Sequence, residues 1–260
     1  MLTSLSNGIV FCEVEGSSSN AIVFLHGWGR SRADFSAMAK EAASAGFITA
    51  SIDLPGFGAT PPPEVGVGTD WYRDVVTRAI CDFVEKNRVA RIAIVGHSFG
   101  GRIALKIASE LSSNSLDLGA QCVGVMISGV PLFRDNAASR APLALRMLKA
   151  AVRLKVVPKS RLERYRNNHG SADYRRAEGV MRETFVKVVN EDYSNHLRSI
   201  ERVPLILFWG KDDASAPFDQ AQRAVELAKG SRLIAVSGDH FTFLGEANDV
   251  VKELSLLFEL

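Results

Sequence analysis

Cysteine is scarce in this chain of 260 residues. Cys12, Cys81 and Cys122 are the only cysteines, and they lie far apart in the sequence with apolar neighbours. A disulfide framework or a thiolate metal site needs cysteines that are paired or closely spaced. The sequence therefore predicts three buried free thiols, and neither a metal nor another cofactor is expected.

Long apolar runs are also missing. No stretch approaches the roughly 20 apolar residues that a membrane-spanning helix needs. The first eight residues do not place a charged region before a long apolar one, as an export signal does. We therefore expect no integral membrane segment and, by default, a cytoplasmic location. A hydrophobic content of 47% and a charged content of 23% are typical of a globular protein.

The chain as a whole has no large excess of one charge, but separate parts of it do. The formal net charge is +2, which gives no reason to expect a nucleic-acid partner. Residues 132–202 carry 16 Lys and Arg against 8 Asp and Glu, so this segment is near +8 and the remainder is near −6. The segment therefore differs in character from the rest of the chain.

What the sequence does contain is an alternation of strand and helix patterns. Apolar runs predict buried strands at 21–25, 47–53, 92–95, 121–128, 204–210 and 233–237, and a weaker alternation predicts an outer strand at 9–14. Apolar residues at helical spacing predict helices at 35–42, 71–83, 103–111 and 250–257. This alternation favours an α/β fold with a mostly parallel, doubly wound sheet.

The alternation stops between Pro131 and Val203. This stretch is helical and basic, and it shows no strand pattern. Ligands of open parallel sheets bind at the carboxyl ends of the strands. We therefore predict a core of residues 1–130 and 204–260, with residues 131–203 inserted as a helical cap, or lid, over the strand ends.

One turn of the chain has the form of a nucleophile site. The residues Gly96-His97-Ser98-Phe99-Gly100 contain the pattern G-x-S-x-G between a predicted strand and a predicted helix. Such a turn presents the serine hydroxyl at the end of the strand, beside a helix N-terminus that favours a developing anion. Ser98 is therefore the candidate nucleophile.

A serine nucleophile needs a histidine base and an acid that orients it. Two adjacent carboxylates, Asp212 and Asp213, follow the strand at 204–210, and His240 follows the last strand. The remaining histidines have weaker claims: His97 flanks the serine, His26 lies in a glycine-rich turn as a structural hydrogen-bonding residue, and His169 and His196 fall in the predicted cap.

With these elements in this order, the chain resembles α/β-hydrolase-fold serine hydrolases with a helical cap, over about residues 20–112 and 200–245. The resemblance implies a catalytic triad of Ser98, Asp213 and His240. It selects Asp213 over Asp212 because the family pattern G-x-x-D-x-x-x-P runs here from Gly210 to Pro217.

The same resemblance implies further roles. The backbone N–H groups of Trp28 and Phe99 would form the oxyanion hole. Trp28, His97 and Phe241 are expected to contact the substrate. Asp53 is expected to shape a loop under the site, and Arg102 to form an ion pair that stabilises the fold.

The substrate class follows less directly. An esterase that hydrolyses a small-molecule carboxylic ester or thioester is the leading hypothesis. The segments His26–Gly29 and Asp53–Gly58 are similar to those of pimeloyl-acyl-carrier methyl ester esterases, although residues 96–100 differ from the Gly-Trp-Ser-Leu-Gly usual there. An acidic or carrier-linked substrate would suit the basic stripe of Arg146, Lys149 and Arg153, which could also be a solvated helix face or a membrane-surface contact.

Two other functions stay open. The same triad could hydrolyse carbon–carbon bonds in vinylogous diketones, or the fold could serve as a ligand receptor or scaffold with little turnover. Ser98 argues against epoxide hydrolases and haloalkane dehalogenases, which place an aspartate at the nucleophile position.

Overall fold

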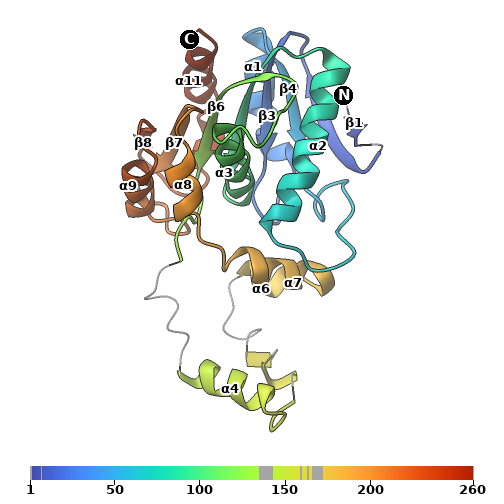
Figure 1. Cartoon of the computed structure of the whole chain (residues 1–260), viewed down its shortest axis with the longest axis vertical. Coiled ribbons are helices and arrows are strands. Elements are labelled where there is room, and N and C mark those ends of the chain that lie inside the picture. The colour runs from blue at the N-terminus through green and yellow to red at the C-terminus, as the bar shows by residue number, and fades with distance from the viewer. Residues whose placement is uncertain are drawn as a thin grey trace.

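The computed structural model describes residues 2–6, 8–134, 143–158, 160–162, 164, 165 and 172–259. Within these ranges an eight-stranded sheet forms the centre of the molecule, with helices on both faces (Figure 1). Its strands are β1 (Leu2–Leu5), β2 (Val10–Glu15), β3 (Asn20–Leu25), β4 (Ile48–Ile52), β5 (Arg91–His97), β6 (Gln121–Ser128), β7 (Leu205–Gly210) and β8 (Arg232–Val236).

The strands follow the order β1-β2-β4-β3-β5-β6-β7-β8. The pairs β1–β2 and β2–β4 are antiparallel, and all other neighbours are parallel. The prediction of a mostly parallel, doubly wound sheet is therefore confirmed. Strand β3 pairs with β5 up to Leu25 and Gly96, so the two turns that follow these strands emerge side by side.

The central strands are apolar throughout because each faces two cores. In β3, Ala21, Val23 and Leu25 belong to one hydrophobic cluster, whereas Ile22 and Phe24 belong to the other. Alternate side chains of a strand point to opposite faces, so a sheet covered on both faces needs an unbroken apolar run. Each large side chain buried in this way stabilises the fold by roughly 1.5–3 kcal/mol.

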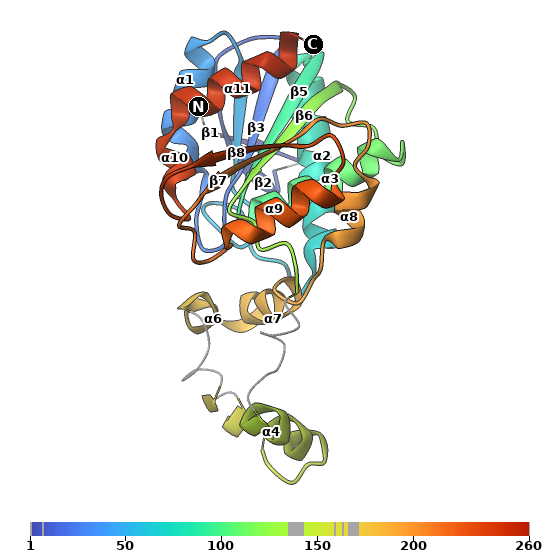
Figure 2. The same ribbon diagram turned by 90° about the vertical axis from the view of Figure 1, so that its left-hand side faces the viewer.

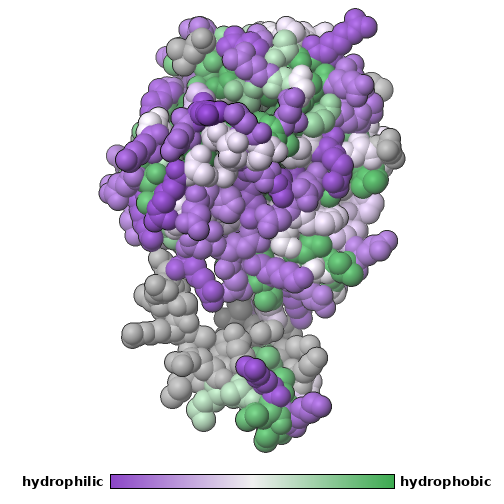
Figure 3. Space-filling model, viewed as in Figure 1, coloured by the Kyte–Doolittle hydropathy of each residue, from purple (hydrophilic) through white to green (hydrophobic). Residues whose placement is uncertain are grey.

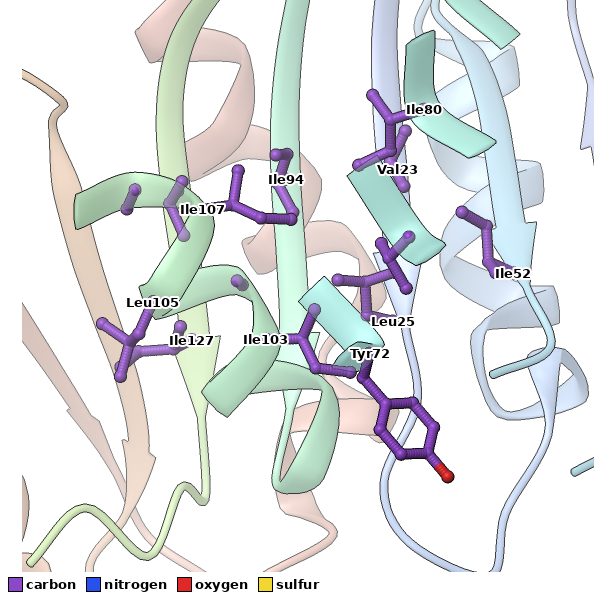
Figure 4. Close-up of a cluster of buried hydrophobic side chains, with 14 of the residues drawn as sticks. Val23, Leu25, Ile52, Tyr72, Ile80, Ile94, Ile103, Leu105, Ile107 and Ile127 are labelled. Atoms are coloured by element: carbon purple, nitrogen blue, oxygen red, sulfur yellow. The ribbon is translucent and has the colours of Figure 1, made fainter. Parts of the chain in front are cut away.

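The first cluster lies under α2 (Thr69–Asn87), α3 (Phe99–Ser112), α8 (Ser194–Ser199) and α9 (Phe218–Leu227). Figure 4 shows part of it, where Ile103 and Ile107 of α3 pack toward Ile94 and Ile127 of the sheet. The second cluster lies on the opposite face, under α1 (Ser36–Ser44), α10 (Thr242–Gly245) and α11 (Ala247–Glu259) (Figure 2). A short 3₁₀ helix, Arg32–Phe35, directly precedes α1.

A helical region is inserted between β6 and β7. Besides α8 it contains α4 (Leu143–Arg153), α6 (Ala172–Arg176) and α7 (Gly179–Val188). Figures 1 and 2 both place α6 and α7 below the sheet and α4 beyond them. Helix α8 packs against α3 and α9, so the end of the inserted region lies on a face of the core.

Hydrogen bonds fasten the inserted region to the loop before α2. The Glu191 carboxylate accepts from the Thr69 backbone N–H at 2.8 Å and from the Tyr193 hydroxyl at 2.8 Å. The Lys187 ammonium donates to the Gly66 carbonyl at 2.5 Å. Because Thr69 is the first residue of α2, the Glu191 carboxylate also lies at the positive end of that helix.

The scarce cysteines are free thiols. Cys12 is buried, and burial raises the pKa of its thiol to about 12. Cys81 and Cys122 are half-buried, so the prediction of full burial is wrong for these two. Among the described residues, no helix combines the length and the hydropathy that crossing a membrane requires.

Candidate active site

Ser98 occupies a strained turn between β5 and α3. Its φ and ψ are 50° and −111°, which a residue with a side chain rarely adopts. The flanking glycines permit the turn, since a Cβ on Gly96 would lie 2.6 Å from the Gly100 carbonyl oxygen. The Ser98 N–H donates to the Ser128 carbonyl at 2.8 Å. These constraints hold the Ser98 side chain at the carboxyl end of the sheet.

Asp213 and His240 form a hydrogen-bonded pair. The His240 Nδ1 lies 2.8 Å from Asp213 Oδ2, and the backbone N–H groups of Ser215 and Ala216 each donate to Asp213 Oδ1 at 2.8 Å. Burial raises the pKa of the Asp213 carboxyl, but these hydrogen bonds outweigh burial and the pKa is lowered overall. An ionised Asp213 accepts a hydrogen bond from the Nδ1–H of His240, so Nε2 carries no proton and can act as a proton acceptor.

Asp212 has different surroundings. Its side chain is exposed, and among the described residues its Oδ2 accepts one long bond of 3.3 Å, from the Gly238 N–H. Of the two adjacent carboxylates, the structure therefore places Asp213, and not Asp212, against His240.

The two expected oxyanion donors lie on neighbouring turns. Phe99 is the first residue of α3, so its N–H has no acceptor within the helix. Among the described residues, no hydrogen-bond acceptor is found for the Trp28 N–H. The Gly100 N–H donates to the His26 carbonyl at 3.0 Å and joins the two turns.

His26 fixes the turn that carries Trp28. Its Nδ1 lies 2.7 Å from the Gly27 carbonyl, and its Nε2 accepts the Leu54 N–H at 3.0 Å. These partners assign the proton to Nδ1, and burial lowers the pKa of the ring. His26 is thus a structural hydrogen-bonding residue, as expected.

His97 contacts the backbone of the candidate base. Its Nε2 lies 2.9 Å from the His240 carbonyl oxygen, so Nε2 carries the proton. Burial, and next the nearby His240, lower the pKa of His97 to about 4. The buried Nδ1 has no partner among the described residues. A neutral His97 thereby ties the turn of Ser98 to the loop of His240.

A cavity of about 1230 Å³ opens over these residues. Ser98 and His240 line it together with Trp28, His97 and Phe241, the residues expected to contact the substrate. The Trp28 ring forms edge contacts with Phe57, Phe99 and Phe185, at centroid distances of 5.0, 5.3 and 5.0 Å. An aromatic wall built from three separate elements therefore flanks the serine.

Comparison with known proteins identifies the fold family. The model of the alpha/beta hydrolase family matches residues 22–254. The chain belongs to this family. A 2-hydroxy-6-oxononadienedioate/2-hydroxy-6-oxononatrienedioate hydrolase of Burkholderia vietnamiensis is 26% identical over 234 residues, which cover 81% of this chain and 76% of that protein.

Solved structures share the same alpha/beta hydrolase fold. A bromoperoxidase from Bacillus anthracis superposes with a TM-score of 0.70 at 19% identity and full coverage of both chains. An esterase from Exiguobacterium antarcticum gives a TM-score of 0.69 at 20% identity, with 99% of this chain and 98% of that chain covered. Identities this low show the fold and leave the substrate unspecified.

Arg102 departs from its predicted role in this alpha/beta hydrolase. Its guanidinium forms no ion pair among the described residues. It donates instead to the Pro131 carbonyl, from Nε at 3.1 Å and Nη2 at 2.8 Å, and from Nη1 to the Val188 carbonyl. It also lies over the Tyr193 ring. The expected ion pair is wrong because two backbone carbonyls, Pro131 at the start of the inserted region and Val188 at the end of α7, take the place of a carboxylate.

Several cavity residues were not singled out from the sequence. Phe57, Met181 and Phe185 form much of the apolar lining, and Arg30 stacks over Phe241 at 5.3 Å. Phe57 lies inside the segment Asp53–Gly58 that carries the family resemblance, so that motif held a usable signal. Met181 and Phe185 belong to α7, whose position over the cavity no local pattern predicts.

The other residues predicted from the sequence can be placed only in part. Asp53 is buried and accepts from the backbone N–H groups of Arg32 and Ala59, each at 2.8 Å, which agrees with a loop-shaping role. In the basic stripe, Arg153 is exposed, and the side chains of Arg146 and Lys149 lie outside the described residues. His169 also lies outside the described residues. Among the described residues, no cluster of three His, Cys, Asp or Glu side chains could hold a metal.

Proposed function

We propose that the protein is a serine hydrolase that cleaves a carboxylic ester or thioester through an acyl-enzyme on Ser98. The observation that carries the proposal is the 2.8 Å bond between an ionised Asp213 and Nδ1 of His240, a residue that lines the same cavity as Ser98. A base oriented in this way, beside a serine at a strained turn, is the arrangement that nucleophilic catalysis requires.

In the proposed reaction, Ser98 Oγ attacks the carbonyl carbon while His240 Nε2 takes the hydroxyl proton. The N–H groups of Trp28 and Phe99 stabilise the oxyanion of the tetrahedral intermediate. The intermediate then expels the alkoxide or thiolate, which takes the proton from His240. A water molecule activated by His240 cleaves the acyl-enzyme and restores the Ser98 hydroxyl.

The cavity lining supports an acyl group with an apolar portion. Trp28, Phe57 and Phe185 offer aromatic surface, and Met181 adds a flexible apolar side chain. A carboxylic ester with a medium or long acyl chain would bury that chain here. The narrower resemblance to pimeloyl-acyl-carrier methyl ester esterases, with an acidic or carrier-linked substrate, stays a prediction.

A second candidate function is hydrolysis of a carbon–carbon bond with the same residues. The observation that favours it is the Burkholderia vietnamiensis relative, whose name describes hydrolysis of 6-oxo dienedioates and trienedioates. In this reaction the triad would act on a ketone carbonyl of a vinylogous diketone, and the leaving group would be a carbon atom.

A substrate panel separates the two functions. We expect p-nitrophenyl esters of graded acyl length to be hydrolysed, with kcat/KM rising as the chain lengthens to fill the aromatic wall, and Ser98→Ala to abolish turnover. Faster turnover of a 6-oxo dienoate than of any ester would select the second function. Binding of these compounds without turnover of either class would instead indicate a receptor or scaffold.

A further inference from the structure

Helix α4 and the turn that follows it expose large apolar side chains beside basic ones. Met147, Leu154 and Val156 are 65%, 74% and 74% exposed, and Arg153 and Lys155 between them are exposed as well. We call these five residues the α4 tip. Figure 3 shows apolar side chains gathered beside hydrophilic ones at this end of the molecule.

The α4 tip ends in a structured turn. Lys155 adopts a positive φ of 58°, the Val156 N–H donates to the Ala151 carbonyl at 2.9 Å, and the Lys155 N–H donates to the Val152 carbonyl at 3.0 Å. These bonds are those of a Schellman-type helix end, which satisfies the last carbonyls of α4. The turn is therefore fixed by its own hydrogen bonds, while Leu154 and Val156 stay exposed although burial of apolar side chains is favourable.

The sequence of this segment fixes the charge of a matching partner. Residues 143–158 contain four basic residues, Arg146, Lys149, Arg153 and Lys155, and no acidic residue. A segment with exposed apolar side chains, whose charged residues are all basic, fits a partner that offers negative charge above an apolar layer. The interface of an anionic lipid bilayer has this composition.

From this geometry we propose that the α4 tip docks the protein on anionic membrane surfaces. Met147, Leu154 and Val156 would enter the boundary between headgroups and acyl chains, while Arg153 and Lys155 remain at the level of the lipid phosphates. A convex helix end suits this insertion. A protein partner would require a matched surface of roughly 800 Å² on each side, which one short helix and its terminal turn do not offer.

Docking in this way would present the catalytic end of the molecule to the lipid. Figures 1 and 2 place α4 on the same side of the sheet as α6 and α7. Residues of both α6 and α7 line the cavity over Ser98, among them Arg176, Met181 and Phe185. An acyl substrate dissolved in the membrane would therefore approach the protein from the cavity's side.

Vesicle sedimentation of the full chain tests the proposal. We expect the protein to bind vesicles of phosphatidylcholine with roughly one-third phosphatidylglycerol, and to bind pure phosphatidylcholine at least about tenfold more weakly. Arg153→Glu with Lys155→Glu, and separately Leu154→Ser with Val156→Ser, should each lower the partition coefficient about tenfold or more.

Two matched controls isolate the position of these residues. Lys40→Glu with Lys229→Glu changes the net charge by the same amount at exposed sites of the core, and Val65→Ser removes an apolar side chain that is 68% exposed. Both should change partitioning less than about twofold. Equal losses in the charge control and the tip variant, no binding by the wild type, or binding to an acidic carrier protein but not to vesicles would overturn the proposal.

Discussion

At the scale of single residues, His97 links pH to stability. Its pKa is about 4 in the folded protein, mainly because it is buried, whereas an unfolded histidine titrates near 6.5. Between these values the unfolded state binds more protons, so this contribution to stability is present above pH 6.5 and is lost as the pH falls toward 4.

The wild type should therefore lose about 2 kcal/mol of unfolding free energy through His97 between pH 7 and pH 5. His97→Asn removes the titrating ring and should flatten the pH dependence by about that amount, which urea unfolding at both pH values would measure. An unchanged slope in the variant would show that His97 is protonated in the folded protein at pH 5.

Asp213 and Asp212 provide a matched pair for testing the proposed triad. Asp213→Asn should lower kcat by roughly 10³–10⁴-fold with little change in KM, because the amide no longer fixes the Nδ1 proton of His240. Asp212→Asn removes an exposed carboxylate with one long hydrogen bond and should change kcat less than about threefold. Steady-state kinetics with one ester decides this prediction, and the reverse ranking would assign the acid to Asp212.

At the scale of secondary-structure elements, close contact between α3 and β3 sets the position of Ser98. A Cβ on Gly100 would lie 2.1 Å from the Leu25 carbonyl oxygen, so Gly100→Ala must push the helix away from the strand. We expect a loss of about 3 kcal/mol in unfolding free energy. Gly245→Ala meets no atom within 4 Å and should stay within about 0.5 kcal/mol of the wild type, so equal effects would contradict the crowding argument.

The hydrogen bonds of Glu191 join the inserted region to the start of α2. Glu191→Gln weakens the bonds from the Thr69 N–H and the Tyr193 hydroxyl and removes the charge near Lys106. Amide hydrogen exchange across α7 and α8 should become roughly 10-fold faster or more, because weakening the hydrogen bonds of this half-buried carboxylate costs about 1–3 kcal/mol. The exposed Glu201→Gln serves as control, and equal exchange in the two variants would argue against the anchor.

Strands β3, β5 and β6 could be predicted from sequence because a strand buried on both faces leaves an unbroken apolar run. Strand β1 has only four residues at the sheet edge, and α9 buries only Ala221 and Ala224 fully, so both patterns are too weak to detect. Two hydrogen bonds join side chains to backbone groups more than 100 residues away: Lys187 to the Gly66 carbonyl, and the Thr69 N–H to Glu191. No local signal encodes such contacts.

For the candidate site, the spacing from Gly210 to Pro217 was enough to choose Asp213, which the structure places against His240. The sequence predicted part of the cavity lining, namely Trp28, His97 and Phe241. It could not predict that Phe185 of α7 packs on Trp28, because this contact joins residues far apart in the chain. It also could not show that Arg102 would bind carbonyl groups, because every residue type carries a backbone carbonyl and the sequence does not mark which one accepts.

At the scale of the whole molecule, function is divided between two regions. The sheet core carries Ser98, Asp213 and His240 at its strand ends, and the inserted region supplies part of the cavity wall and the α4 tip. On the proposed function, the core would determine the reaction type, and the insertion would contribute, together with core residues of the cavity wall, to substrate selection. Mutations in α7 should change the preferred acyl length without abolishing turnover.

The prediction for α7 concerns Phe185, which packs on Trp28 at 5.0 Å. Phe185→Ala enlarges the cavity and should shift the optimum in a p-nitrophenyl ester series toward longer or bulkier acyl groups, with kcat for the best ester within about tenfold of the wild type. A uniform loss across the series would instead indicate that Phe185 only positions the oxyanion turn.

Covalent labelling by a fluorophosphonate tests whether Ser98 is an activated nucleophile, because this probe reacts with serines that a neighbouring base has activated. The account predicts one phosphonyl group per chain, located on Ser98 by peptide mass spectrometry, with slower labelling in Asp213→Asn and none in Ser98→Ala. A correctly folded wild type that stays unlabelled, or labelling that persists in Ser98→Ala, would contradict it.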